Sequence, residues 1–210
     1  MAKIKEKNSY FWTTYSDLMS SLFFIILVLF ILTIAMLFRQ NKATKAQLEK
    51  IKQINKSIEK IDNKYFEYDE DYKRHTLKDI QVSFNKGSDN IYDIPYEDRS
   101  KLISAGNAIV RFMTDAKFSK DTKDSEYLLI IEGQTSKDNY KGNYELSFRR
   151  ALSLVNLWRN YGINFDNLPC ELIVSGSGQD SHFRMSPDNR FNRNNQRFVI
   201  HILPKPGKID

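Results

Sequence analysis

The chain has 210 residues, of which 41% are apolar and 28% charged, and its formal net charge is +6 at pH 7. Eight glycines, five prolines and an aromatic fraction of 13% exclude collagen-like, low-complexity and wholly disordered chains. The single cysteine, Cys170, excludes an intramolecular disulfide framework. The mean hydropathy of −0.52 is typical of a soluble domain. Residues 18–38, however, form one uncharged and mostly apolar run, which indicates a membrane-anchored globular protein.

Glycine and proline divide the sequence into two parts. No glycine precedes Gly87 and no proline precedes Pro95. Because both residues interrupt helices, we expect nearly continuous helix up to residue 75 and a compact domain from residue 76. Most of the excess positive charge lies in the first part rather than on a folded surface, so we expect no nucleic-acid partner.

Residues 18–38 are long enough to cross a membrane. As a helix they would be about 31 Å long, which matches the hydrocarbon core of a bilayer. The run is too long for a signal peptide and lacks a small-residue cleavage site, so we expect an uncleaved single-pass anchor. Aromatic residues before it would lie at one membrane interface: Tyr10, Phe11, Trp12 and Tyr15. The alternative is the buried core helix of a soluble protein.

The orientation of this span follows from its surroundings only in part. Basic residues flank it on both sides, so the positive-inside rule is close to undecided. The short segment 1–17 favours a cytoplasmic N-terminus and membrane entry, with the rest of the chain exported. We therefore expect an inner-membrane protein whose C-terminal domain is periplasmic.

Asp17 is the one charged residue between Lys7 and Arg39. A carboxylate at the edge of a membrane span is costly unless it faces protein or water, so such a residue is a functional candidate. Polar residues at helical spacing share its face: Thr13, Ser20 and Ser21. This arrangement predicts an ion-accepting carboxylate that faces the helices of a partner. The alternative is an interfacial cap at the start of the helix.

Residues 39–75 predict a charged helical stalk with a narrow apolar seam. The seam residues recur at alternating spacings of about four and three: Ile54, Ile58, Ile61, Tyr65, Tyr68 and Tyr72. Such a seam indicates either self-pairing of two helices, hence a dimer, or a single amphipathic helix that lies on its own domain. Both interpretations remain open from the sequence.

Residues 76–205 predict an α+β domain with the element order β-α-β-α-β-β and helices packed against one sheet. The expected elements are strand 80–84, helix 96–118, strand 127–132, helix 143–161, strand 170–174 and strand 197–203, followed by a tail at 206–210. The polar segment 175–195 is long for a loop, and long loops are often functional.

The domain shows no catalytic constellation. His75, His182 and His201 lack the spacing of metal ligands, and Cys170 is typical of a buried apolar position. Gly176-Ser-Gly178 lacks the lysine and the helix of a phosphate-binding loop. We therefore expect neither an enzyme, nor a cofactor, nor a metal site.

Three motifs resemble the peptidoglycan-binding OmpA-like domains, over about residues 78–203. They are Gly133-Gln-Thr135, then Asn143-Tyr-Glu-Leu146-Ser147-Phe-Arg-Arg150-Ala151 with Leu154-Val155, and Gly176-Ser-Gly178 with Asn195-Gln-Arg197-Phe-Val199. The resemblance implies a pocket for the carboxylate and the amine of the diamino acid in the peptidoglycan stem peptide. Ser136 stands where that family has an acid, and Asp138 would supply the missing charge.

The same resemblance implies roles for residues of the second helix and the loop before it. Arg150 can bind a carboxylate through two parallel hydrogen bonds. Asn143 would offer amide donors, and Leu146 would support the wall of the pocket. The alternative for Arg150 is an ordinary surface salt bridge.

The N-terminal part is similar to stator subunits of the MotB type, through the aromatic Tyr10-Phe-Trp12 and the following Tyr15-Ser16-Asp17-Leu18-Met19. This resemblance implies an ion-driven motor subunit in which Asp17 carries a proton or a sodium ion. The short chain and continuous stalk look most like the ZorB subunits of Zorya anti-phage systems. That resemblance implies a dimer inside a pentamer of a multi-span partner of the ZorA or MotA type.

Three other classes remain open. One is a flagellar stator subunit, and another is a passive membrane protein that tethers the wall without an ion path. The third is an energy-transducing subunit of the ExbD or TolR type, whose periplasmic domain lacks the second-helix motif.

Overall fold

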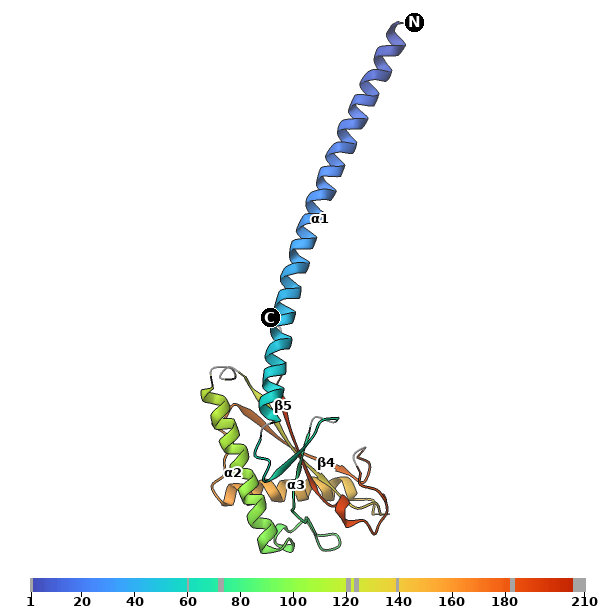
Figure 1. Cartoon of the computed structure of the whole chain (residues 1–210). Coiled ribbons are helices and arrows are strands. Elements are labelled where there is room, and N and C mark those ends of the chain that lie inside the picture. Colours follow the sequence, from blue (N-terminus) through green and yellow to red (C-terminus); the bar gives the residue numbers. More distant parts are fainter. Residues whose placement is uncertain are drawn as a thin grey trace. The chain divides into compact units, whose positions relative to one another are not determined.

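The structure is a computed structural model that describes residues 2–59, 61–71, 74–119, 122, 125–138, 140–181 and 184–205. Its elements in chain order are α1 (Ala2–Ile58), β1 (Phe66–Asp69), β2 (Arg74–Leu77), the 3-10 turn η1 (Ile91–Asp93), α2 (Tyr96–Phe118), β3 (Tyr127–Gln134), α3 (Asn143–Asn160), β4 (Cys170–Gly178), the 3-10 turn η2 (Arg193–Asn195) and β5 (Phe198–Pro204) (Figure 1). The chain divides into two compact units, residues 1–50 and residues 51–210.

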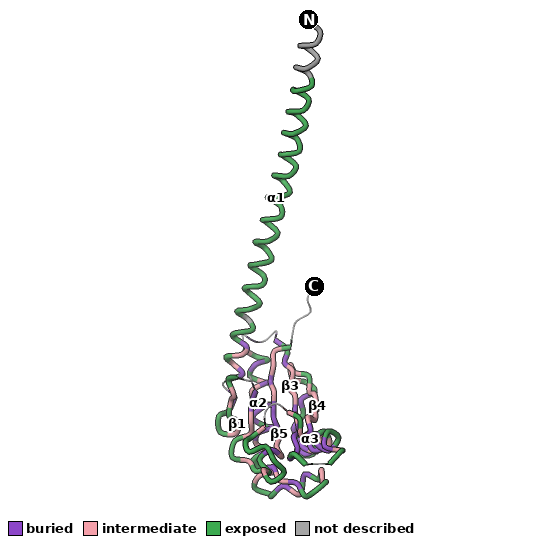
Figure 2. The backbone as a smooth tube through the Cα atoms, turned by 90° about the vertical axis from the view of Figure 1, so that its right-hand side faces the viewer, coloured by how far each residue is buried: buried purple, intermediate pink, exposed green. Residues whose placement is uncertain are grey.

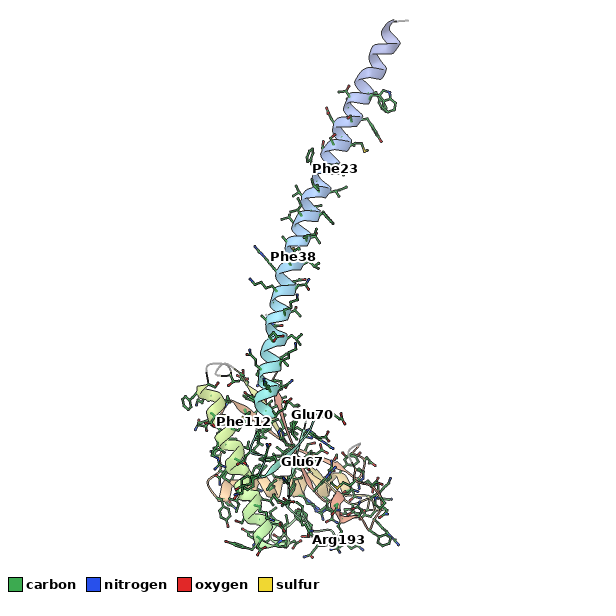
Figure 3. All side chains as sticks on the ribbon, in the orientation of Figure 1. Phe23, Phe38, Glu67, Glu70, Phe112 and Arg193 are labelled. Atoms are coloured by element: carbon green, nitrogen blue, oxygen red, sulfur yellow. The ribbon has the colours of Figure 1, made fainter. Side chains whose placement is uncertain are left out.

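The first unit consists of the N-terminal part of α1. Every side chain that the structure describes from Phe11 to Glu49 is exposed, including the large apolar ones (Figure 2). Phe23 and Phe38 point outward from the ribbon, with exposed fractions of 61% and 71% (Figure 3). By length and composition, α1 is able to cross a membrane. The side chain of Tyr10, expected at the interface, lies outside the described residues.

The second unit is built on a five-stranded sheet with the strand order β1-β2-β5-β3-β4 (Figure 1). Neighbouring strands are antiparallel except β3 and β4, which run parallel and are connected through α3. Parallel neighbours need such a crossover, and a helix commonly supplies it. In β3 the buried side chains alternate, with Tyr127, Leu129 and Ile131 fully enclosed. The predicted α+β class is confirmed.

Helices α2 and α3 also contribute buried residues to the core. Trp158 of α3 is fully buried, and its indole Nε1 donates a 2.8 Å hydrogen bond to the carbonyl of Leu102 in α2. Gly106 makes this approach possible, because a Cβ at that position would lie 2.7 Å from the indole. The helix expected at 96–118 is confirmed at the residues predicted.

The last turns of α1 belong to the second unit and complete its core. Ile54, Ile58 and Ile61 are at most 5% exposed. The side chain of His75 in β2 donates from Nε2 to the carbonyl of Ile58, over 3.1 Å, at the point where the helix ends. The prediction of a helix up to residue 75 is therefore wrong, since the absence of glycine and proline permits a helix but does not require one.

Of the two interpretations of the apolar seam, the structure supports the helix that packs on its own domain. The isoleucines of the seam are enclosed within the second unit, so they are not available to a second helix. Tyr65 lies in a turn and Tyr68 in β1, and Tyr72 lies outside the described residues.

The expected strand at 80–84 is also wrong. Val82 and Phe84 are buried, which explains the alternating pattern, but this segment forms no strand. The position beside β5 is occupied instead by β2, where His75 and Thr76 pair with Ile200 and Val199. The remaining expected strands are present, with β3 and β4 extending further than predicted.

Candidate functional site

Asp17 lies on the part of α1 in which every described side chain is exposed. The hydroxyl of Ser21 donates to the backbone carbonyl of Asp17, one helical turn before it. This bond commits the serine to the backbone, so its hydroxyl proton does not point at the carboxylate. Ser21 therefore donates no hydrogen bond to the carboxylate of Asp17.

In the second unit, the start of α3 is held against the sheet by glycines. A Cβ on Gly133 of β3 would lie 2.1 Å from the carbonyl oxygen of Ser147, and one on Gly176 of β4 would lie 2.4 Å from the backbone nitrogen of Phe148. Ser147 is fully buried, and its hydroxyl accepts a 2.9 Å hydrogen bond from the N–H of Gly178. Two of the sequence motifs thus fix the position of α3 on β3 and β4.

Asp138 and Asn143 meet at the N-terminal end of α3. The side-chain amide Nδ2 of Asn143 donates to Oδ1 of Asp138 over 2.7 Å and to Oε1 of Gln179 over 3.3 Å. The same Oε1 accepts from the backbone N–H of Asp138 over 3.1 Å. Asn143 is 4% exposed, whereas Asp138 is exposed. Leu146, one turn further along, is 4% exposed and lines the buried side of the helix.

Arg150 lies on the buried face of α3 and is 3% exposed, so it is not a surface salt bridge. Its Nε donates to the carbonyl of Ser88 over 2.9 Å, and its Nη2 lies 3.5 Å from the carbonyl of Asn85. The guanidinium stacks over the ring of Phe84, 4.4 Å from its centre. Nη1 has no hydrogen bond with the described residues and is not among the polar atoms closed off from solvent. It is the nitrogen through which Arg150 can reach a ligand.

The charges around Arg150 are mixed. Burial lowers the pKa of Arg150 to about 10, although the carboxylates of Asp89, Asp93 and Asp138 act in the opposite direction. The guanidinium stays protonated at neutral pH, and its nearest charged neighbours are acids. This mixture of one cation and several acids is suited to a group that carries both charges.

Ser136 occupies the place of the acid expected from the motif. It is 7% exposed, and its hydroxyl accepts a 2.9 Å hydrogen bond from the side chain of Gln196. The side-chain oxygen Oε1 of Gln196 in turn accepts a hydrogen bond from the backbone N–H of Phe84 over 3.4 Å. This neutral pair links the segment before α2 to the loop after β3, so the position carries no charge.

Among the predicted residues, Asp138 and Asn143 are in direct contact, and Arg150 is close enough for the charge of Asp138 to affect it. Gln179 was not predicted as a site residue, although it directly follows the Gly176-Ser-Gly178 motif. The backbone carbonyls that hold Arg150 were also missed, because a sequence pattern does not show which carbonyl a distant loop presents.

A second polar group, on β3, β4 and β5, was not predicted. Oε1 of Glu132 accepts hydrogen bonds from Ser177 and Gln134, and its Oε2 lies 3.0 Å from Nε2 of His201. Burial by itself would raise the pKa of Glu132, but hydrogen bonds from His201, Gln134 and Ser177 lower it to about 2. Glu132 is thus a permanent carboxylate that ties three strands together.

Cys170 and the groups that could ligate a metal bear on catalytic chemistry. Burial raises the pKa of the Cys170 thiol to about 11, so the thiolate is scarce at neutral pH. Within the described ranges, no three His, Cys, Asp or Glu side chains form a group that could hold a metal ion. A cavity of about 430 Å³ lies between the last turns of α1 and the end of α2, with Ser57, Phe112 and Thr122 in its lining, and none of its lining residues belongs to the candidate site.

No protein-family model and no curated protein matches the sequence. Among solved structures, partial likeness is found to the OmpA-like domain of FopA1 from Francisella tularensis subsp. tularensis SCHU S4, at 14% identity, covering 68% of this chain and 82% of that chain, with a TM-score of 0.41. The periplasmic domain of Helicobacter pylori MotB is 18% identical, covering 67% of this chain and 88% of that chain, with a TM-score of 0.45. A MotB-like protein from Desulfovibrio vulgaris is 17% identical, covering 81% of this chain and 99% of that chain, with a TM-score of 0.42. Scores at this level do not transfer a property from these proteins to this chain, whose function is argued from its own residues.

Proposed function

We propose that this protein anchors an ion-driven motor of the inner membrane to peptidoglycan. One observation carries the proposal: a single chain joins an apolar helix with one acid, Asp17, to a domain in which Asp138 and Asn143 meet at the start of α3 and the charge of Asp138 acts on Arg150 of the same helix. The first feature suits ion transfer, and the second suits a ligand that has both charges.

In the membrane, Asp17 binds and releases a proton or a sodium ion at an interface with the partner. A carboxylate in a medium of low dielectric constant is costly when charged, and binding of a cation neutralises it. Each cycle of binding and release therefore changes the electrostatic attraction between Asp17 and the partner's helices. This change is the step that moves the partner.

At the wall, Arg150 binds the carboxylate of the stem-peptide diamino acid through Nη1, and Asp138 binds the ammonium group. Oδ1 of Asp138 already accepts two hydrogen bonds, from Asn143 and from the N–H of Tyr140, while Oδ2 has none with the described residues. A ligand held between Nη1 and Oδ2 meets one donor and one acceptor of opposite charge.

The partner in this proposal is a multi-span membrane protein arranged as a pentamer around a dimer of this chain. Within the class of motors we favour anti-phage defence of the ZorB type, because α1 continues as one helix from the apolar segment to Ile58. Flagellar motility is the second candidate, and it predicts loss of swimming rather than loss of phage resistance when the gene is deleted.

Two variants test the two halves separately, in cells that carry the native partner. Asp17→Asn should abolish ion flux while leaving assembly and wall retention unchanged, and Asp17→Glu should retain part of the flux. Arg150→Gln should weaken retention on purified peptidoglycan by about tenfold, the effect of one lost charge-assisted hydrogen bond. Arg149→Ala is the matched control on the same helix, since Arg149 is more exposed and pairs with Asp89 and Glu145.

The outcomes separate the alternatives. Full activity of the Asp17→Asn protein would show a passive tether without an ion path. Unchanged wall retention of the Arg150→Gln protein, with folding verified by circular dichroism, would show that this pocket is not the wall site.

A further inference from the structure

Gln179, in the loop after β4, holds the two polar residues at the start of α3 in place. We infer that Gln179 is a positioning residue for an ammonium-accepting subsite formed by Asp138 and Asn143. This inference rests on the proposed function and deepens it, because it states which atoms of the pocket read the positive group of the ligand.

The hydrogen bonds determine how the amide of Asn143 is oriented. A carboxylate accepts but does not donate, so the nitrogen of the amide must face Oδ1 of Asp138, over 2.7 Å. Oε1 of Gln179 accepts from the same nitrogen and from the N–H of Asp138. Both donors of the Asn143 amide are therefore directed at acceptors of its own chain.

This orientation reverses the role expected for Asn143. From its motif position, Asn143 was expected to offer amide donors to the ligand, whereas in the structure those donors are directed inward. The remaining oxygen, Oδ1, has no hydrogen bond with the described residues, and it is not among the polar atoms closed off from solvent. Asn143 consequently offers the ligand an acceptor.

Asp138, which is bonded to the amide of Asn143, offers a second acceptor. With Oδ1 occupied by Asn143 and Tyr140, Oδ2 is left for a ligand. One carboxylate oxygen and one amide oxygen together suit an ammonium group, which has three donors and no acceptor. The subsite therefore selects for a free amine and against an acylated one.

The subsite depends on Gln179 because this side chain is bonded both to the amide of Asn143 and to the backbone N–H of Asp138, and so connects the two acceptors. Asp138 is exposed, and Gly142 at the start of α3 provides no side-chain cap. Gln179, by contrast, follows a rigid position: Gly178 has φ +57°, and its N–H is bonded to the buried Ser147. Gln179 thus connects the well-ordered end of β4 to the loop that contains Asp138 and limits the movement of that loop.

The test uses the full-length protein in detergent micelles and three synthetic stem tripeptides that end in a diamino acid. One peptide is unmodified, one has the side-chain amine acetylated, and one has the side-chain carboxylate amidated. The unaltered protein should prefer the free amine over the acetylated one by about tenfold, the worth of a charge-assisted hydrogen bond. In Gln179→Met, which keeps the size but removes the acceptor, this preference should fall to about one. Gln179→Glu keeps the acceptor oxygens and should keep the preference.

Discrimination between the free and the amidated carboxylate distinguishes this inference from the proposed function. It is assigned to Arg150 and should be the same in Gln179→Met as in the unaltered protein. An undiminished preference for the free amine in Gln179→Met would overturn the inference and leave the proposed function standing. Absence of binding of all three peptides to the unaltered protein would overturn both.

Discussion

Residues 11–49 of α1 and the domain from residue 51 contain similar apolar side chains in opposite environments. Along α1 the phenylalanines, leucines and isoleucines are exposed within the chain, whereas in the domain the core residues are mostly below 5% exposed. A contiguous apolar surface of this extent requires a lipid or protein environment. The domain, by contrast, covers its own apolar residues. The first region therefore depends on its surroundings for stability, and the second depends on its internal packing.

The two tryptophans give the largest expected difference between the regions. Trp158 is fully buried and hydrogen-bonded to Leu102, so Trp158→Ala should lower the free energy of unfolding of the domain by about 3–5 kcal/mol. Trp12 is 65% exposed, and Trp12→Ala should change that free energy by less than about 0.5 kcal/mol. Pulse proteolysis of both full-length variants in urea measures the two effects. Equal destabilisation by the two variants would contradict the distinction between the exposed part of α1 and the packed domain.

Two isoleucines locate the boundary between the regions. Ile58 is 2% exposed and Ile51 is 44% exposed, although both lie on α1. Ile58→Ala should lower the free energy of unfolding of the domain by about 3 kcal/mol, through lost contacts and a residual cavity. Ile51→Ala should change it by less than about 0.5 kcal/mol. The same urea titration measures both, and a large effect at Ile51 would move the boundary toward the N-terminus.

The sequence predicted a long apolar N-terminal helix, both domain helices and most of the strands, because the uncharged run and the apolar periodicity of the domain elements are regular. It failed at the junction, where residues 59–75 were expected to be helical. There the isoleucines and tyrosines at heptad-like spacing are equally compatible with a helix end followed by a hairpin. The helix ends at Ile58 because elements distant in the sequence bury these residues, and residue spacing alone does not predict such burial.

The residues of the candidate site were also predicted only in part, because some of their partners lie far away in the sequence. The α3 motif pointed to Asn143 and Arg150, because both belong to a single pattern within one helix. The hydrogen-bond partners of the Asn143 amide were not predictable from the sequence, since one of them, Gln179, lies 36 residues further along the chain. Contacts of this kind follow from the packing of α3 on β4.

The third prediction concerns pH and the end of α1. Burial lowers the pKa of His75 from 6.5 to about 4, although its hydrogen bond to Ile58 acts in the opposite direction. Between these values the unfolded chain binds a proton that the folded domain does not, so stability is lost as the pH falls from about 6.5 to 4. From pH 8 to pH 5 the domain should lose about 2 kcal/mol, a first-order figure.

His75→Gln, which retains a donor for the carbonyl of Ile58, should reduce this pH dependence. Glu132 contributes at lower pH only, because its pKa of about 2 in the folded domain lies below that of an unfolded glutamate near 4.5. The measurement is urea unfolding at pH 8, 6.5 and 5 for both proteins. An identical slope in the two would show that His75 is not the group responsible.

The smallest expected effect is that of the ion pair between Arg111 of α2 and Asp62, the residue after the buried Ile61. The two groups are 3.6 Å apart, with side chains 64% and 39% exposed. Because exposed pairs contribute little, Arg111→Ala should lower the free energy of unfolding by about 0.5 kcal/mol or less, and added salt should reduce the effect further. Asp62→Ala should cost more, since Oδ1 of Asp62 also accepts from the N–H of Lys64 over 3.1 Å. Equal costs for the two variants would mean that the turn after α1 is stabilised mainly by the ion pair. The expected inequality would mean that the turn is stabilised by the hydrogen bond from the N–H of Lys64 to Asp62, and the junction by the buried isoleucines.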